Sequence, residues 1–175
     1  MISRITTFAF EGVEARPVDV QVQLSGGANY FAIVGLPDKA VRESGDRVRA
    51  AFTALGLSLP PERVLVNLAP ADLPKEGSHY DLAIALAILA AIGAIPRDSL
   101  EGVAAMGELA LDGGLADTAG ALPAAMAAEA LEMARNIVSM LNRTSTQSLD
   151  RREPEEPAYD PAELYGIMPV DRRKP

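Results

Sequence analysis

Apolar and polar residues alternate near the beginning of the chain. Between residues 18 and 24 the apolar positions are Val18, Val20, Val22 and Leu24, and polar residues occupy the positions between them. This period of two predicts a strand with one face in water, and the Ser-Gly-Gly sequence that follows predicts a turn. Residues 30–34 form a continuous apolar run, which predicts a second strand in the interior of a sheet.

The pattern then changes to a helical period. Asp38 is a suitable N-cap for a helix. The predicted buried stripe of this helix consists of Val41, Val48, Ala51, Phe52 and Leu55. Residues 63–68 predict another strand. A second helix is predicted to begin near Ser78, whose hydroxyl lies three residues before Asp81 in a capping-box pattern, and to end at Gly93.

The third part of the pattern begins with residues 103–111, which predict a strand that is followed by a glycine turn. A third helix is predicted to start around Pro123. Its apolar stripe consists of Leu122, Met126, Ala130, Met133, Ile137 and Leu141. The predicted order of elements opens with strands that have no helices between them. This order favours a mixed α+β or α/β sandwich over a purely parallel sheet.

Composition divides the chain into two regions. Residues 1–141 carry the periodic segments, and residues 142–175 are rich in proline and charge. A segment such as RREPEEPAYDPAEL cannot bury enough apolar surface to offset its ordering entropy. We therefore predict a domain over 1–141 and an extended or disordered tail over 142–175.

Composition and charge also narrow the class of protein. The 175 residues include no Cys and one His, and the formal net charge is -8. The missing cysteines exclude a disulfide framework and favour a reducing, cytoplasmic setting. The longest apolar run, residues 82–95, is too short to cross a bilayer, so no membrane association is expected. The acidity argues against a free-standing binder of nucleic acid.

Motifs for nucleotide chemistry are missing from this sequence. The three lysines, Lys39, Lys75 and Lys174, follow Asp, Pro and Arg, whereas a phosphate-binding P-loop needs Gly-Lys followed by Ser or Thr. A glycine fingerprint for dinucleotides is also absent. We therefore expect no cofactor in this chain.

The segment from 67 to 81 is the most distinctive one. It connects a predicted strand to a helix N-terminus, where exposed amides and the helix dipole can hold an anion. Its candidate binding residues are Asn67, Asp72, Lys75, Glu76, Ser78, His79 and Asp81. The alternative interpretation is an ordinary connection in which Ser78 and Asp81 cap the helix. A Ser-His-Asp triad is rejected because Ser78, His79 and Asp81 are nearly contiguous.

The first helix carries a second candidate surface. Lys39, Arg42 and Arg49 lie near one face, with Arg47 beside it, and such a strip can contact DNA or a neighbouring subunit. The alternative is a solvated face on which acidic residues of the same helix, Glu43 and Asp46, pair with these cations.

Three blocks of sequence resemble a known family. NYFAIVGLPDKAVRESGDRVRAAF, NLAPADLPKEGSHYDLAIALAILAA and GELALDGGLADTAGALPAAMAA, within residues 3–128, are similar to the N-terminal domain of ComM/YifB proteins, the Mg-chelatase-like AAA+ ATPases. This resemblance implies the ribosomal protein S5 domain 2-like fold, shared with the Lon protease domain. It implies a hexameric parent protein linked to DNA branch migration in natural transformation, whose separate ATPase module binds ATP and Mg²⁺.

The Lon-like comparison bears on catalysis. Lon-type proteases resemble this chain at residues 74–77 and 107–109, but their serine would fall near His79 and their lysine near Leu122. Neither catalytic side chain is matched. Ser78 and Lys75 remain the weak candidates for a degenerate Ser/Lys hydrolase.

The C-terminal segment has a different resemblance. Residues 128–175 are similar to the linker of acyl-CoA carboxyltransferase β subunits, which implies a junction near Ala124 to Glu129. Three hypotheses follow: a non-catalytic accessory domain of a ComM/YifB-type protein that acts through the ATPase module, like subunits or DNA; the degenerate hydrolase; and a non-functional fusion product.

Overall fold

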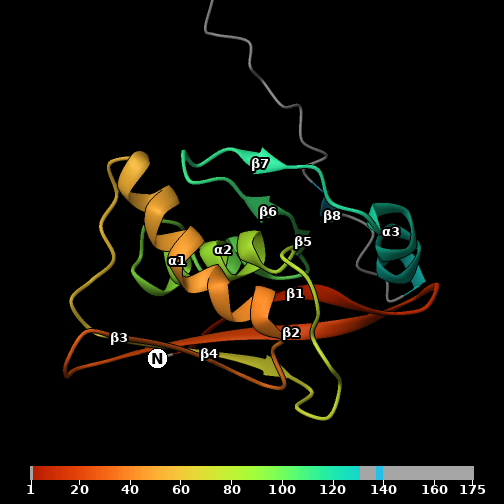
Figure 1. Ribbon diagram of the computed structural model, residues 1–175, viewed down its shortest axis with the longest axis horizontal. Helices are drawn as coiled ribbons and strands as arrows, with labels where there is room; N and C mark the ends of the chain where they lie inside the picture. The colour runs from red at the N-terminus through yellow and green to blue at the C-terminus, as the bar shows by residue number, and fades with distance from the viewer. Residues whose placement is uncertain (1, 131–136, 140–175) are drawn as a thin grey trace, which may run out of the picture. The chain divides into compact units, whose positions relative to one another are not determined.

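The computed structural model describes residues 2–130 and 137–139 (Figure 1). Its strands are β1 (Ile2–Glu11), β2 (Glu14–Ser25), β3 (Tyr30–Val34), β4 (Arg63–Ala69), β5 (Ala104–Met106), β6 (Glu108–Leu109), β7 (Leu115–Ala116) and β8 (Ile137–Ser139). Its helices are α1 (Lys39–Ala54), α2 (Asp81–Ala91) and α3 (Ala121–Ala130), with a short 3-10 turn at Asp98–Leu100. The predicted tail, residues 142–175, lies outside the described residues.

The main sheet is mixed, and its strands follow the order β3-β4-β2-β1-β5, with the short β8 beside β5. β1 and β2 form an antiparallel hairpin, and β2 is also antiparallel to β4. β3 runs parallel to β4, and β5 parallel to β1. The carboxyl ends of β1, β3, β4 and β5 therefore point toward the same edge of the sheet. The α+β class is confirmed.

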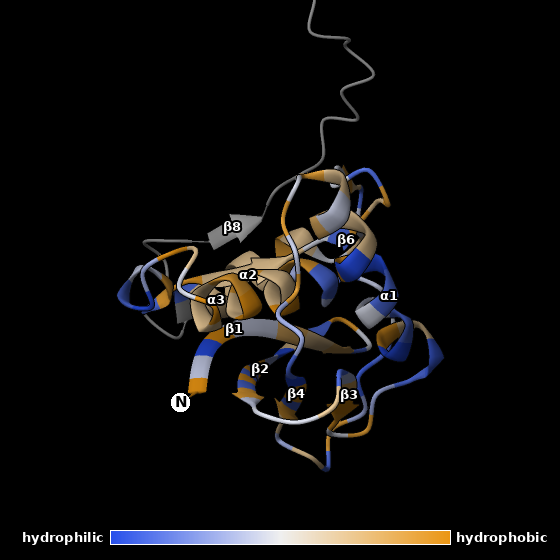
Figure 2. Cartoon of the chain, turned by 90° about the vertical axis from the view of Figure 1, so that its left-hand side faces the viewer, coloured by the Kyte–Doolittle hydropathy of each residue, from blue (hydrophilic) through white to orange (hydrophobic). Residues whose placement is uncertain are grey.

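One face of the sheet carries the main core. The predicted alternation in β2 is confirmed, because Val18, Val20 and Val22 are fully buried while Gln21 and Gln23 are not. These valines pack with the equally buried alternate residues of β4 and with α2. In Figure 2 the apolar colour gathers along α2, which is buried on most of its circumference. Burying each such aliphatic side chain contributes about 1.5–3 kcal/mol.

The opposite face of the sheet carries a second, smaller cluster. Ala105 of β5 belongs to the main core, but its neighbours Ala104 and Met106 pack with Phe8 and with Ala124 and Ala128 of α3. Successive side chains of a strand point to opposite faces. α3 therefore covers the face that α1 and α2 leave open at β1 and β5.

Two glycines allow α1 to lie close to the sheet. A Cβ on Gly35 would stand 2.1 Å from the Leu68 carbonyl oxygen, and φ is +102° there, so the turn from β3 into α1 requires glycine. A Cβ on Gly45 would stand 2.8 Å from the ring of Phe31. Asp38 caps α1 as predicted, because its Oδ1 accepts a hydrogen bond of 2.7 Å from the Val41 amide.

Some predicted elements differ in position. The apolar run Tyr30–Val34 was predicted to be interior, but β3 is the outermost strand of the sheet. The sequence of β3 is apolar because α1 covers one face of this strand. The strand predicted over 103–111 is two short strands, because the chain turns at Gly107 from the main sheet into the β6–β7 hairpin. Leu55 was predicted to be the last buried residue of the first helix, but it is 60% exposed.

The third predicted helix is the largest difference. α3 ends at Ala130, and Ile137 lies in β8, so a single helix to residue 141 is wrong. The predicted stripe is also turned outward, because Leu122 and Met126 are 72% and 63% exposed while Ala124 is buried. Small alanine side chains let α3 approach Phe8 closely, and the larger residues are left outside. Met133 and Leu141 lie outside the described residues.

Among the residues that the structure describes, no helix is long and apolar enough to cross a membrane.

Candidate functional site

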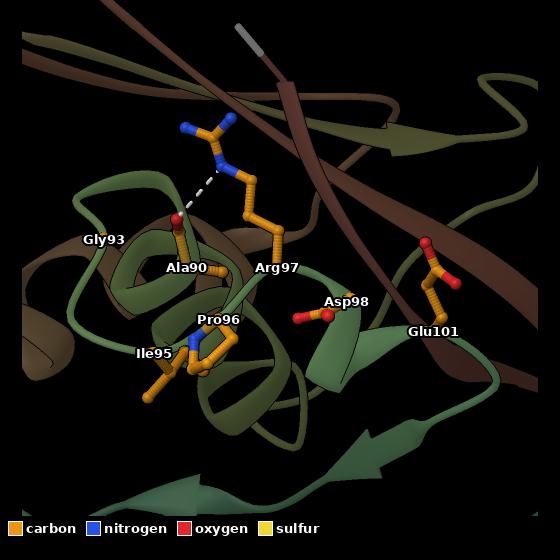
Figure 3. Close-up of a pocket in the computed structure, with 7 residues that line it drawn as sticks. All are labelled: Ala90, Gly93, Ile95, Pro96, Arg97, Asp98 and Glu101. Carbon is orange, nitrogen blue, oxygen red and sulfur yellow. Dashed lines mark hydrogen bonds between the residues drawn. The ribbon is translucent and has the colours of Figure 1, made fainter.

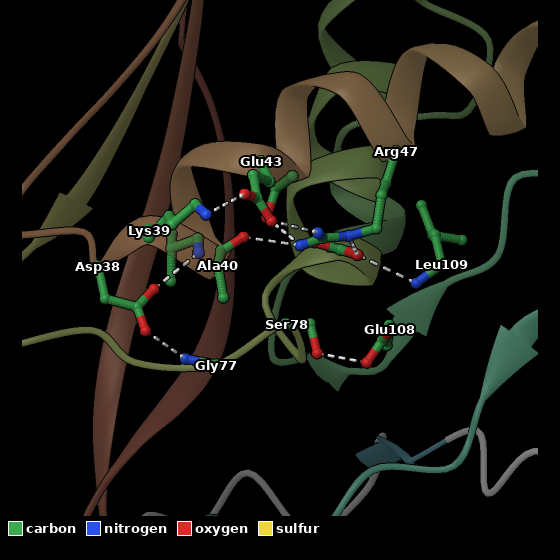
Figure 4. A network of polar contacts seen from close by, with 12 residues as sticks. Asp38, Lys39, Ala40, Glu43, Arg47, Gly77, Ser78, Glu108 and Leu109 are labelled. Carbon is green, nitrogen blue, oxygen red and sulfur yellow. Dashed lines mark hydrogen bonds and ion pairs between the residues drawn. The ribbon is translucent and has the colours of Figure 1, made fainter.

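The segment from 67 to 81 lies where the carboxyl ends of β3, β4 and β5 meet. It leaves β4 and enters α2, and it passes beside the turn that leads from β3 into α1. In open sheets of parallel strands this edge is where ligands usually bind. The sheet of this chain is mixed, so this position alone assigns no ligand to the segment. Figure 4 shows the contacts of its side chains.

Asp38 joins this segment to α1. Its Oδ1 caps the helix, and its Oδ2 accepts a hydrogen bond of 3.1 Å from the Gly77 amide. The backbones also pair, because the Asp38 amide donates to the Lys75 carbonyl at 2.9 Å and the Lys75 amide donates to the Leu36 carbonyl at 3.1 Å. One carboxylate thus serves two chain segments 39 residues apart.

Lys75 is fully buried although it is charged in solution. Its Nζ donates to the Pro70 carbonyl oxygen. Burial lowers the pKa of this ammonium group, and Asp72 opposes that effect only in part. This hydrogen bond therefore joins the two ends of the loop from Pro70 to Lys75. Lys75 makes no hydrogen bond to Ser78 in the described part of the chain.

Arg47 and Asp81 form an ion pair between α1 and α2, in which the Asp81 side chain is fully buried and the Arg47 side chain is 17% exposed. The guanidinium donates from Nε to Asp81 Oδ2 at 2.5 Å and from a terminal nitrogen to Oδ1 at 3.0 Å. Asp81 is fully buried and also accepts from the Leu109 amide at 3.1 Å. The hydrogen bonds that Arg47 donates to Asp81 raise the pKa of the guanidinium group. This group of contacts joins α1, α2 and β6.

Ser78 and His79 attach the start of α2 to the sheet. The Ser78 hydroxyl donates to a carboxylate oxygen of Glu108. His79 Nε2 lies 2.8 Å from the Phe8 carbonyl oxygen, and its ring packs between those of Phe10 and Tyr80. Burial lowers the pKa of His79, so the neutral imidazole is favoured.

These contacts correct the predicted capping box. α2 begins at Asp81, and its N-cap residue, Tyr80, makes no side-chain hydrogen bond to the helix. The Ser78 hydroxyl does not cap the helix because it donates a hydrogen bond to the Glu108 carboxylate instead. Asp81 turns toward Arg47 because pairing a buried carboxylate with a cation avoids a larger desolvation penalty.

Tyr80 was not singled out by the sequence. It is fully buried, and its hydroxyl has no hydrogen-bond partner among the described residues. Burial, followed by the negative charges of Asp38 and Glu76, raises the pKa of this phenol. A Tyr next to a predicted helix start gives no sequence signal of this kind.

The other predicted residues of the segment lie apart from this cluster. Asn67 is on β4 and donates to the side-chain oxygen of Gln21 at 3.1 Å, so it belongs to the open face of the sheet. Asp72 and Glu76 are exposed. Lys75, Ser78, His79 and Asp81 therefore contact four different partners, and no hydrogen bond joins these four side chains to one another in the described part of the chain.

The basic strip on α1 is partly occupied. Lys39 and Arg47 lie 3.7 and 3.8 Å from Glu43, and Arg49 lies 3.5 Å from Asp46. Both helical pairs proposed as the alternative interpretation are present. No ion pair involves Arg42 in the part of the chain that the structure describes, and Arg42 is exposed.

A separate hollow lies at the other end of α2 (Figure 3). Its lining residues are Ala90, Gly93, Ile95, Pro96, Arg97, Asp98 and Glu101. Arg97 donates from Nε to the Ala90 carbonyl oxygen at 3.3 Å, and it thereby satisfies the C-terminal end of the helix. No group of acidic, His or Cys side chains suited to a metal ion occurs among the described residues.

Comparison with known proteins identifies a family. Residues 20–142 match the family described as subunit ChlI of Mg-chelatase. The chain is 41% identical over 149 residues to the uncharacterized protein YifB of Salmonella typhimurium and 43% identical over 137 residues to that of Escherichia coli. It is 47% identical over 118 residues to the competence protein ComM of Haemophilus influenzae.

These matches cover 85%, 78% and 67% of this chain but 29%, 27% and 23% of the three relatives. The chain thus spans about a quarter of the length of the relatives it matches.

Proposed function

Because the chain belongs to the family of the Mg-chelatase subunit ChlI, as the N-terminal ChlI-like domain of YifB/ComM proteins, we propose that it is a non-catalytic accessory domain. In this proposal it acts through contacts with an AAA+ ATPase module or with like subunits of a hexamer. ATP and Mg²⁺ belong to that module, and DNA is reached only through the full-length protein. We propose that the full-length protein acts in DNA branch migration during natural transformation. The name of the Haemophilus relative, a competence protein, supports the link to transformation.

The observation that carries this proposal is the use made of the 67–81 segment. Three of its polar side chains are engaged with α1, β6 and β1: Asp81 with Arg47, Ser78 with Glu108, and His79 with Phe8. A Ser/Lys hydrolase needs its lysine within hydrogen-bond reach of its serine, whereas Lys75 donates to the Pro70 carbonyl oxygen and Ser78 donates to Glu108. Here each group instead stabilises a junction, which suits a rigid platform for protein contacts.

We also propose the finer description of the fold, the ribosomal protein S5 domain 2-like class. Its support is the order of elements, in which three strands precede α1, β4 and α2, together with the mixed sheet β3-β4-β2-β1-β5.

Charge supports protein contacts over direct binding of DNA. Residues 1–124 hold nine basic and 15 acidic side chains, a net charge of -6. Binding of DNA requires clustered cations that neutralise several phosphates, and on α1 two of the four candidates pair with Glu43. We therefore expect the isolated chain to bind DNA weakly.

Two assays on the purified 175-residue chain test this proposal. The first measures ATP hydrolysis with Mg²⁺ beside intact E. coli YifB, and we expect no turnover by this chain. The second is a gel-shift with duplex and single-stranded DNA at physiological salt, where we expect no complex at nanomolar protein. ATP turnover by this chain, or a nanomolar complex with DNA, would overturn the proposal.

A further inference from the structure

Leu36, in the turn from β3 into α1, has a backbone conformation that leucine rarely adopts. Its φ is +54°, in the left-handed region, where the Cβ of an L residue crowds the following carbonyl oxygen. Pro37 follows it, and a residue before proline is normally extended. Among the residues that the structure describes, no other residue except glycine has a positive φ. Strain of this kind persists only where the surrounding structure holds the residue in place.

Backbone contacts on both sides hold Leu36 in this conformation. Its carbonyl oxygen accepts a hydrogen bond of 3.1 Å from the Lys75 amide, and the Asp38 amide donates to the Lys75 carbonyl at 2.9 Å. On the other side, Gly35 lies too close to the Leu68 carbonyl oxygen for any side chain. These contacts involve only the backbone around residue 36. Asparagine or glycine, which tolerate a positive φ, would therefore satisfy the fold there.

The side chain of Leu36 contributes to neither apolar cluster of the domain. It is 56% exposed, although Pro37 after it is buried. Val34, two residues before it, is 44% exposed, so apolar side chains are exposed on both sides of Gly35. Core packing thus does not explain why a leucine occupies this strained position. An apolar side chain on a rigid backbone suits a protein contact, because little conformational entropy is lost when it binds.

The surface around this turn is acidic. Asp72 and Glu76 are exposed, and they precede and follow Lys75, whose backbone pairs with residue 36. The Lys75 side chain is fully buried, so its charge is not presented at the surface. Lys39, at the start of α1, lies 3.7 Å from Glu43 of the same helix. A partner that covers Leu36 therefore meets negative charge beside the leucine.

From these observations we propose that Leu36 is the anchor through which this domain binds the ATPase module of its full-length relatives, in an apolar pocket bordered by Lys or Arg side chains. The inference rests on the proposed function, in which the domain works through contacts with that module. Two copies of this chain that met symmetrically at the turn would set Asp72 and Glu76 against the same carboxylates. Charge therefore favours a different, basic surface over a second copy.

The lengths of the relatives also favour this partner. Residue 36 lies within the matched residues 20–142, and the chain spans only about a quarter of the length of YifB and ComM. In those proteins the remaining three quarters belong to the same polypeptide. Two parts of one chain meet at a high effective concentration, so a small apolar anchor with a charged border is sufficient for a stable contact.

Titration calorimetry of the full 175-residue chain against E. coli YifB that lacks its matched segment measures this contact. We expect Leu36→Asn to raise the dissociation constant about tenfold or more, because the apolar anchor is lost. Leu111→Asn is the matched control. It removes a leucine that is 66% exposed in the β6–β7 turn, beside the other end of α1, and we expect it to bind with wild-type affinity.

Urea unfolding of the same variant separates a contact from a folding role. Asparagine tolerates the left-handed region better than leucine, so Leu36→Asn should unfold at the same urea concentration as the wild-type chain or at a higher one. A lower midpoint would mean that the leucine serves the fold. A dissociation constant equal to that of the wild-type chain would mean that it serves no contact with the module. Either result would overturn the inference.

Salt and charge reversal test the basic border of the pocket. Salt screens the attraction, so we expect the wild-type dissociation constant to rise between about 0.05 and 0.5 M NaCl. Asp72→Lys with Glu76→Lys should weaken binding and flatten this dependence, and an affinity that salt leaves unchanged would refute the basic border. A cooperative urea transition verifies that the shortened YifB is folded. If the wild-type chain does not bind it, the proposed function fails together with the inference, whereas equal binding by Leu36→Asn overturns the inference alone.

Discussion

Removing one partner of the Arg47–Asp81 pair is expected to destabilise the domain strongly. Arg47→Met leaves the fully buried Asp81 carboxylate with only the Leu109 amide as donor. The two guanidinium hydrogen bonds, at 2.5 and 3.0 Å, are lost. Breaking a buried ion pair on one side costs about 3–5 kcal/mol, whereas a neutral hydrogen bond contributes only about 1 kcal/mol.

The double variant separates the pair from its individual charges. Arg47→Met with Asp81→Leu removes both charges and leaves two apolar side chains of similar size in their place. Such replacements are often neutral or stabilising by comparison with the intact pair. We therefore expect each single variant to lose about 3–5 kcal/mol and the double variant to lose less than either, with a coupling energy of about 2 kcal/mol or more.

Urea unfolding followed by far-ultraviolet circular dichroism measures these free energies, because the chain has no Trp to serve as a fluorescent reporter. Exposed Arg49, which lies 3.5 Å from Asp46, supplies the matched control, and Arg49→Met should cost less than about 1 kcal/mol. Two results would refute the view that this junction holds α1, α2 and β6 together. In the first, each single variant loses no more unfolding free energy than Arg49→Met. In the second, the losses of the two single variants simply add in the double variant.

Three further predictions concern the same region. Asp38→Ala removes the cap of α1 and the acceptor of the Gly77 amide, so we expect a loss of about 2 kcal/mol in urea unfolding, and a loss below 0.5 kcal/mol would contradict both contacts. Burial lowers the pKa of His79 in the folded chain, so the imidazole binds a proton more readily in the unfolded chain, and the free energy of unfolding should be greatest above pH about 6.5 and fall below it by at most about 1.4 kcal/mol per pH unit. His79→Gln should flatten this slope between pH 7.5 and 5.5. An equal slope in the two proteins would refute the assignment. Ser78 donates to Glu108 and not to Lys75, so a serine-reactive phosphonate should leave the chain unlabelled in mass spectrometry, and labelling that Ser78→Ala abolishes would establish the hydrolase instead.

The sequence predicts the elements well where a single face is buried. β2 has one face in the core, so the period of two places Val18, Val20 and Val22 correctly. α1 has one apolar stripe and an Asp at its start, and both features are local. A short run such as Tyr30–Val34 contains no information about its neighbours, so its position at the edge depends on pairing with residues 63–67, more than 30 positions away.

α3 shows the limit of periodicity. Its buried side is made by Ala124 and Ala128 because Phe8 and Met106 fill the space opposite them, and those partners come from two distant strands. An alanine-rich segment carries little amphipathic signal, so the larger apolar residues Leu122 and Met126 are taken for the core although they are exposed.

The sequence predicts where the 67–81 segment lies but not which residues its side chains contact. The spacing of a strand, a polar segment and a helix predicts where residues 67–81 lie, because that arrangement is local. The partners of its side chains are not local, since Arg47 lies 34 positions before Asp81 and Glu108 lies 30 positions after Ser78. The capping-box pattern predicted the wrong partner for Ser78 for this reason.

A chimera tests the accessory role most directly. Residues 1–142 of this chain replace the matched segment of E. coli YifB, which is 43% identical over 137 residues, and the assembled mass and ATP hydrolysis of the chimera are measured beside intact YifB and YifB without that segment. The account predicts that the chimera matches intact YifB in both measurements and that the shortened protein does not. A chimera that behaves like the shortened protein, or a shortened protein that behaves like intact YifB, would contradict the claim that this domain supports a separate ATPase through protein contacts.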